Sequence, residues 1–237
     1  MDARWQRRLK VRRISTIAII VSLIILIIFA GFTVYGNKVG NFVINVNNDG
    51  IKLSLSAKDD LSEQTGRLVF PGVSQVGDIT YGELPEDIAQ NGIGEKSVDR
   101  KYLAFSFYLI NNTDRSVDYN MDLNVIDTVG DPFSVLRVML ISGEKNTFDE
   151  ANKIFALPEE TEEKQQYLDE GLNRFGFYKT MDIDLTDNKV FSVKETDLEA
   201  GGAQKYTVVM WIEGCDEDCS NERLGDRVKL QLDITGY

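Results

Sequence analysis

An uncharged apolar run that directly follows a cluster of basic residues places the strongest constraint on this chain. The run begins at Ile14 and ends at Val34, and 14 of its 21 residues are Ile, Leu, Val or Phe. As a helix it would be about 31 Å long, which is enough to cross the hydrocarbon core of a bilayer. We therefore expect one transmembrane helix, and the rest of the chain must fold outside the lipid.

The charges around this run predict its orientation. Six basic residues and one acid precede it, so the positive-inside rule keeps the N-terminus in the cytoplasm. The sequence thus predicts a single-pass protein of the cell membrane. Its parts are a basic cytoplasmic segment at residues 1–13, a signal anchor at 14–35 and an extracellular domain at 36–237. The alternative is a cleaved signal peptide, whose apolar stretch is usually shorter, about 7 to 15 residues.

The composition of the outer domain excludes several classes of function. Removing residues 1–37 leaves 20 basic and 37 acidic residues, a net charge near −17, which repels nucleic acid phosphates. The chain has no histidine, so Ser-His-Asp and Cys-His catalysis are excluded. Two cysteines are too few for a four-thiolate zinc site. We expect no enzyme activity, no cofactor and no nucleic acid partner.

Apolar residues alternate with polar ones along most of this outer domain, which is typical of strands with one buried face. Alternating segments lie at residues 42–46, 51–55, 103–109, 117–125 and 228–234. Two further segments, 136–141 and 206–212, are almost continuously apolar, which indicates strands buried on both faces. With about eight or nine strands, the sequence predicts a mainly β protein, an antiparallel, jelly-roll-like β-sandwich.

Turn residues predict which strands are neighbours. The sequence Asn48-Asp49-Gly50 predicts a hairpin between 42–46 and 51–55. Residues 111–114 predict that 103–109 and 117–125 also pair. A short helical excursion is expected at 158–171, which starts with proline and ends with glycine. Residues 58–66 and 73–99 are expected to be loops.

An acidic turn near residue 215 offers the first candidate site. Glu213, Asp216 and Asp218 are carboxylates that could bind a hard cation such as Ca²⁺, although they lack the spacing of a calcium-binding loop. The competing interpretation is an ordinary solvated acidic turn. Cys215 and Cys219 lie in the same turn and could form a small local disulfide on the oxidising side of a membrane, with a reduced pair as the alternative.

Two other patterns suggest chemistry but have ordinary explanations. Asp182 and Asp184 could supply the two carboxylates of acid-base catalysis, but with Ile183 facing inward both acids should face water. Asn111 heads an Asn-x-Thr sequence that fits the N-glycosylation rule. Neither pattern nominates a catalytic residue.

Short stretches of the chain resemble a group of exported proteins of Gram-positive-type bacteria. These stretches are residues 34–42, 102–109, 136–139, 206–219 and 224–226. The group is distantly similar to the TasA/camelysin-like biofilm-matrix proteins, so the resemblance implies a jelly-roll sandwich at the cell surface. Cys215 and the segment after Pro158 depart from the group's pattern. Strand donation between TasA-type subunits requires a released N-terminal segment.

Three functional hypotheses follow from these observations. The first is a membrane-anchored, non-enzymatic binding or structural module with surface proteins or itself as partners. The second is a secreted TasA-like matrix or fibre subunit that exchanges residues 41–56 between copies after signal cleavage. The third is a carboxylate-based glycan hydrolase, which needs two acids and no histidine.

Overall fold

The computed structural model describes residues 16, 19–26, 42–47, 50–70, 73, 76–85, 87–91, 101–143, 153–158, 180–216 and 218–237. The chain divides into two compact units, Met1–Gly40 and Asn41–Tyr237. In the first unit, residue 16 and residues 19–26 are helical, and the apolar side chains of 19–26 are exposed. No helix in the described ranges is long and apolar enough to span a membrane. Most of the predicted span from Ile14 to Val34 lies outside these ranges.

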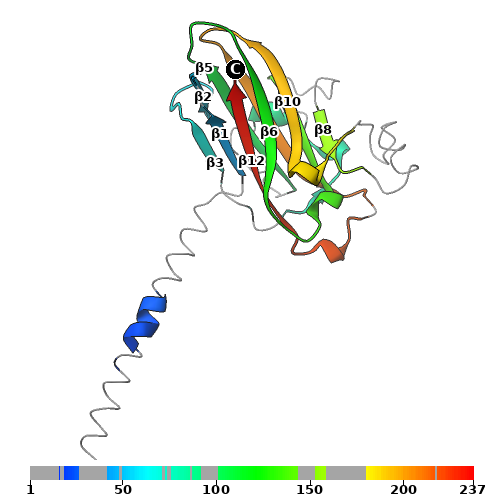
Figure 1. Ribbon diagram of the computed structural model, residues 1–237. Coiled ribbons are helices and arrows are strands. Elements are labelled where there is room, and N and C mark those ends of the chain that lie inside the picture. Colours follow the sequence, from blue (N-terminus) through cyan, green and yellow to red (C-terminus); the bar gives the residue numbers. More distant parts are fainter. Residues whose placement is uncertain are drawn as a thin grey trace, which may run out of the picture. The chain divides into compact units, whose positions relative to one another are not determined.

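The second unit is mainly β and consists of two sheets, which confirms the predicted sandwich (Figure 1). Sheet A has, in order, β10 (Lys189–Leu198), β6 (Val117–Val129), β12 (Arg227–Gly236), β1 (Phe42–Asn47) and β3 (Arg67–Phe70). Sheet B has β2 (Leu53–Ser56), β5 (Tyr102–Asn111), β11 (Ala203–Glu213), β7 (Leu136–Ser142), β8 (Lys153–Ala156) and β9 (Thr180–Asp182), and β4 (Asp78–Ile79) also pairs with β11. Short 3-10 helices are η1 (Tyr81–Glu83), η2 (Pro132–Ser134), η3 (Leu185–Asp187) and η4 (Asn221–Arg223).

The sheets are mixed, so the prediction of a purely antiparallel sandwich was wrong. β1 runs parallel to β12 and antiparallel to β3, β4 runs parallel to β11, and β8 runs parallel to β9. Alternation of apolar and polar residues reveals which face of a strand is buried, but it is the same for both strand directions. The sequence pattern therefore does not reveal whether two neighbouring strands run parallel or antiparallel.

Both predicted hairpins were also wrong, for one physical reason. β1 lies in sheet A and β2 in sheet B, and in the same way β6 lies in sheet A and β5 in sheet B. Each turn thus carries the chain from one sheet to the other across the core. Strands in opposite sheets face the same core with their apolar sides, so their sequence patterns match those of a paired hairpin.

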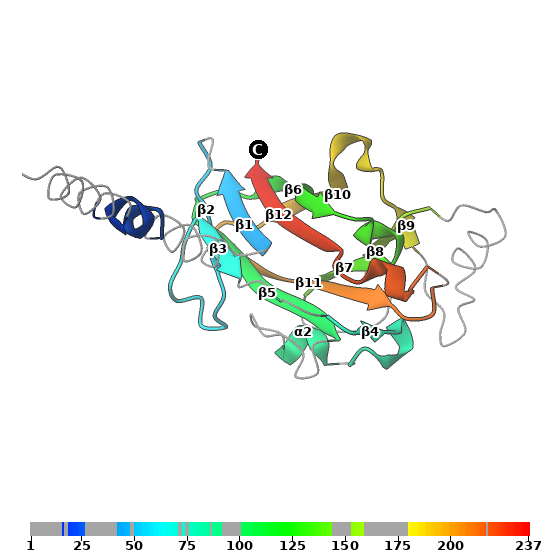
Figure 2. The same ribbon diagram turned by 90° about the horizontal axis from the view of Figure 1, so that it is seen from below.

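The core between the sheets contains the apolar faces of all the long strands. Its fully buried members include Ile44, Leu55, Phe107, Met121, Leu123 and Leu232. A second apolar cluster lies on the other side of sheet B, where residues 78–91, named here the covering segment, pack against it. Figure 2 shows β4 and α2 (Ile88–Asn91) on the side of β5 and β11 that is turned away from sheet A.

The covering segment explains the least polar strands of the sequence. Ile79, Tyr81, Leu84, Ile88 and Ala89 are buried in a cluster with residues from β5, β7 and β11. β7 and β11 are therefore apolar on both faces, as expected. Residues 73–99 were expected to be loop because the sequence placed no short elements there, and the structure has β4, η1 and α2 within this range. The helix expected at 158–171 lies almost wholly outside the described residues.

An aromatic cluster ties β1 to both sheets. The ring of Phe42 stacks on Phe70 of β3 at 5.8 Å and on Phe105 of sheet B at 4.9 Å between ring centroids. Phe42 is 3% exposed. The first strand of the domain is thus part of its core.

Replacing this ring should destabilise the domain strongly. Phe42→Ala is expected to lower the free energy of unfolding by about 3 to 5 kcal/mol, because it leaves a cavity where three rings meet. Urea unfolding of the full chain in a mild detergent would measure this change. Val69→Ala on β3 is the control, because Val69 is 46% exposed and its loss should change stability by about 0.5 kcal/mol or less. Equal effects of the two variants would contradict the burial of β1.

Two tyrosines form a buried hydrogen-bonded pair across the sandwich. The hydroxyl groups of Tyr119 in β6 and Tyr206 in β11 are bonded to each other. Burial raises the pKa of Tyr119 from 10.0 to about 12 and raises the pKa of Tyr206 as well. Both phenols are therefore neutral in the folded domain at any physiological pH.

This pair should make the domain sensitive to alkali. The unfolded chain releases the two protons near pH 10 while the folded chain keeps them, so stability is fully present below pH 10 and is lost as the pH rises toward about 12. The free energy of unfolding should fall over this window. It should fall less steeply in the double variant Tyr119→Phe/Tyr206→Phe. Identical slopes for both proteins would contradict the assignment.

Candidate functional site

The acidic turn after β11 is positioned by the strand's own alternation. Trp211 and Glu213 are two residues apart on β11, so both side chains lie on the face of sheet B that the covering segment buries. Trp211 is fully buried and Glu213 is 2% exposed. Trp211 is therefore a core residue of sheet B.

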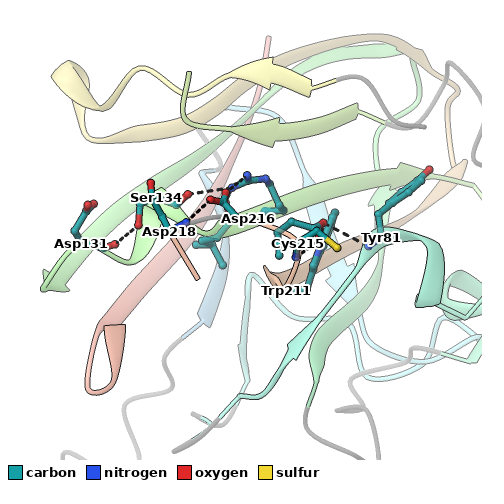
Figure 3. A network of polar contacts seen from close by, with 10 residues as sticks. Tyr81, Asp131, Ser134, Trp211, Cys215, Asp216 and Asp218 are labelled. Atoms are coloured by element: carbon teal, nitrogen blue, oxygen red, sulfur yellow. Dashed lines mark hydrogen bonds and ion pairs between the residues drawn. The ribbon is translucent and has the colours of Figure 1, made fainter. Parts of the chain in front are cut away.

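The carboxylate of Glu213 is used to hold the covering segment. Its Oε2 accepts hydrogen bonds from the indole N–H of Trp211 at 3.1 Å and from the backbone N–H of Tyr81 at 3.4 Å. Its Oε1 accepts one from the backbone N–H of Cys215 at 3.3 Å. The same side chain thus joins β11, η1 and the turn, as Figure 3 shows for Tyr81, Trp211 and Cys215.

Asp216 forms a buried ion pair with Arg137. The Nη2 of Arg137 lies 2.5 Å from the Oδ2 of Asp216, and the two side chains are 2% and 3% exposed. The Nη1 of Arg137 also donates to the carbonyl of Ser134 at 3.4 Å. Asp216 Oδ1 in turn accepts from the backbone N–H of Asp218 at 2.9 Å. Figure 3 shows this network running from Asp216 and Asp218 to Ser134.

These contacts give the carboxylates of the turn structural roles. The carboxylate of Glu213 accepts hydrogen bonds from N–H groups, and that of Asp216 is paired with the guanidinium of Arg137. These two carboxylates and that of Asp218 do not converge on one binding centre. Within the described residues, no three His, Cys, Asp or Glu side chains come together as a metal site. Of the three residues that the sequence nominated for Ca²⁺, Glu213 and Asp216 thus use their carboxylates to stabilise the turn and its neighbours, and Asp218 takes part through its backbone N–H.

Both cysteines of the turn are thiols in this structure. Burial raises the pKa of the Cys219 thiol, and the carboxylates of Asp78, Asp216 and Glu213 raise it further. A raised pKa disfavours the thiolate, which is the form that oxidises and binds metals. The disulfide between Cys215 and Cys219 stays a prediction.

The two other patterns from the sequence also have structural roles. Ile183 is buried while Asp182 and Asp184 are exposed, as expected. The hydroxyl and backbone N–H of Thr186 bond to Asp184 and lower the pKa of that carboxyl, which is opposite to what a general acid requires. Asn111 is fully buried, and its amide nitrogen donates to the carbonyls of Arg115, Leu198 and Glu199, so it anchors the crossing from β5 to β6.

The buried ion pair gives a direct test of the turn. Asp216→Asn is expected to destabilise the domain by about 3 to 5 kcal/mol, because it leaves the Arg137 charge buried without its partner. The double variant Arg137→Met/Asp216→Asn removes that charge and should be more stable than Asp216→Asn alone. Urea unfolding measures both.

A matched control comes from an exposed pair. Lys58 and Glu63 form an ion pair at 2.5 Å with side chains 50% and 72% exposed, so Glu63→Gln should change the free energy of unfolding by less than about 1 kcal/mol. If Asp216→Asn had no larger effect than Glu63→Gln, the ion pair would not hold the turn.

The outer face of sheet A differs from the covered face of sheet B. Ten polar outward side chains on β10, β6, β12 and β1, named here the polar face, are half-buried or exposed, and Val43, Arg67 and Val69 lie beside them on the same side of the sheet. The ten residues are Asn45, Asn47, Asn120, Asp122, Asn124, Ser192, Lys194, Gln231, Asp233 and Thr235. Strand register aligns them in rows, one of which runs from Asn45 through Asp233 and Asp122 to Ser192. Figure 1 shows the four strands that carry them side by side.

Asp233 is the centre of this face. It accepts hydrogen bonds from the side-chain amides of Asn45 at 3.2 Å, Asn124 at 2.8 Å and Gln231 at 3.0 Å. The neighbouring Asp122 accepts from Asn120 at 3.0 Å and has the ammonium of Lys189 at 3.4 Å. The contacts hold the amide side chains in fixed orientations on an open surface.

Sequence reasoning missed this array. The predicted strands 117–125 and 228–234 contain half of its residues, and their polar positions were assigned simply to solvent. What the sequence lacked was the pairing of β6, β12 and β1, which brings residues up to 188 positions apart into contact. The excess of carboxamides over charged residues at these positions was the available signal.

Comparison with known proteins adds no relative to this picture. No protein-family model matches the chain, and searches of curated proteins and of solved structures give no significant match.

Proposed function

We propose that this chain is a membrane-anchored cell-surface protein whose sandwich acts as a non-enzymatic binding or structural module. The polar face of sheet A is the observation that carries this proposal. It combines hydrogen-bonding side chains in fixed orientations with exposure to solvent, whereas the covering segment buries part of the outer side of sheet B. The apolar run from Ile14 to Val34 and its basic flank support display outside the membrane.

The chemistry of the described residues favours binding over catalysis. The chain has no histidine, and the paired acids Asp182 and Asp184 are exposed on the surface with the pKa of Asp184 lowered. Buried Glu213 and Asp216 are engaged in structural contacts. A glycan hydrolase would need a carboxylic acid with a raised pKa facing a second acid.

A TasA-like matrix or fibre subunit with a jelly-roll fold is the alternative, and the position of β1 favours it. β1 is the first strand of its unit and pairs with β12 on one side and β3 on the other. A copy of the same strand from another subunit could take this place by strand addition. This function would require release of the chain from its anchor.

One experiment separates the two functions. The full chain carrying a phosphatase after Tyr237, active only outside the cytoplasm, would be expressed in a bacterium, and the N-terminal residue of the product would be determined. Tethered display predicts an active reporter in the membrane fraction and an N-terminus upstream of Ile14. As an orientation control, replacing Arg7, Arg8, Arg12 and Arg13 by Glu should reduce reporter activity.

Two outcomes would decide against tethered display. An inactive reporter would place the domain on the cytoplasmic side and overturn both proposals. An active product in the medium that begins after Gly31 would favour the released fibre subunit.

A further inference from the structure

We propose that the polar face binds neutral polysaccharide. This inference rests on the proposed function and names its class of ligand. It is carried by the amide groups around Asp233, by the negative charge of the domain, which disfavours anionic polymers, and by an exposed aromatic ring at the end of the face.

The amide groups offer unused hydrogen-bonding capacity. Asn45, Asn124 and Gln231 direct an amide N–H at Asp233, and within the described residues their side-chain oxygens accept no hydrogen bond. Each amide keeps its acceptor oxygen for a ligand, and Asn45 also keeps a second N–H donor, whereas the nitrogen of Asn124 also donates to the carbonyl of Asp122 at 3.4 Å and that of Gln231 bonds both carboxylate oxygens of Asp233. Neighbouring hydroxyl groups of a sugar ring, each both a donor and an acceptor, match such groups in pairs. Because Asp233 already fixes the amides, little side-chain entropy is lost on binding.

The charges of the face disfavour an anionic ligand. Asp122 is paired with the ammonium of Lys189, whereas Asp233 keeps its negative charge and accepts hydrogen bonds from three neutral amides. Anionic polymers are repelled by the net charge of the domain.

The side-chain types on the face argue against a protein partner. The ten residues of the polar face include no Met, Phe or Trp, which are enriched at protein interfaces, and the one Arg beside them, Arg67, lies on β3 at the edge of the sheet. An uncharged, polyhydroxylated chain is a ligand that fits the side chains of this face.

Tyr237 adds an apolar surface beside these polar groups. It is 54% exposed, and the ammonium of Lys194 lies 4.9 Å from its ring centroid. The cross-strand partner of Lys194 is Asn120, so the ring lies at the Asn120 end of the polar face. An exposed aromatic ring can pack against the C–H face of a pyranose while its hydroxyl stays in water.

The repeating layout of the sheet suits a repeating polymer. Four adjacent strands, about 4.8 Å apart, each present Asn, Asp, Gln, Ser or Thr side chains in aligned rows. A surface of this kind can contact several sugar units of one extended chain. Contacts along a chain add up, so a long polymer should bind more tightly than one sugar.

Binding is tested with the full-length protein and two defined polysaccharides. The chain, in a detergent without sugar groups, is mixed with insoluble cellulose or chitin, and the bound fraction is measured after sedimentation. We expect binding to at least one of these neutral polymers. We also expect Asn124→Ala/Gln231→Ala to weaken it about tenfold, since several hydrogen bonds are lost.

The matched control is a second surface pair of the same residue types. Asn112, directly after β5, donates to Gln64 on the exposed connection between β2 and β3 at 3.1 Å, away from the polar face. Asn112→Ala/Gln64→Ala should leave binding within twofold of wild type. Circular dichroism would verify that both double variants fold.

The outcomes separate this inference from the proposed function. Lack of binding to both polymers, or equal loss in the two double variants, would overturn the polysaccharide assignment. That result would leave cell-surface display standing, because the reporter experiment measures display without reference to any ligand. Binding to the anionic polymer heparin in preference to both neutral polymers would also overturn it.

Discussion

Burial of sheet B on both of its faces is the constraint on which the rest of this domain depends. One face packs against sheet A and much of the other against the covering segment, so the middle of β7 and of β11 is mostly apolar on both faces. A strand of an antiparallel sheet commonly has one face for water. Because the covering segment buries part of this face of sheet B, the outer side of sheet A is the broader solvent face of the sandwich. The carboxylate of Glu213, bonded to Trp211 and to the backbone of Tyr81, fixes the covering segment in its place.

The sequence was informative about strands and uninformative about their neighbours. Residues 103–109, 117–125 and 228–234 lie within β5, β6 and β12, because period-two alternation reports burial of one face directly. The same alternation suits two strands in one sheet and two strands facing each other across a core. For that reason the turns before Ile51 and after Asn111 were interpreted as hairpins, whereas they connect sheet to sheet. Asn111 provides the mechanism, since its buried amide binds the carbonyls of Leu198 and Glu199 on the other side.

The same difference between local and long-range information applies to the candidate sites. Local features of the acidic turn were visible, but their meaning depended on Arg137, which is 79 residues away and supplies the charge that engages Asp216. A carboxylate that looks available in sequence is here neutralised by a long-range partner. Asp184 was predicted to face water, and it does. This could be inferred because it depends on nearby residues, namely buried Ile183 and the hydrogen bond from Thr186. Roles set by nearby residues can be inferred from sequence, and roles set by strand pairing require the fold.

The polar face contains a pairing that stability alone does not favour. Asp122 and Asp233 are directly opposite each other on β6 and β12, and like charges in this arrangement are destabilising. Three amides around Asp233 and the ammonium of Lys189 near Asp122 offset the repulsion. A Thr or Lys in place of either aspartate would avoid the repulsion between the two carboxylates and would need fewer hydrogen-bonding neighbours. Departures from local rules that are compensated by a built network concentrate at functional sites. The amides that offset this repulsion are the same amides that would face a ligand. The network that stabilises the face therefore also orders it for binding.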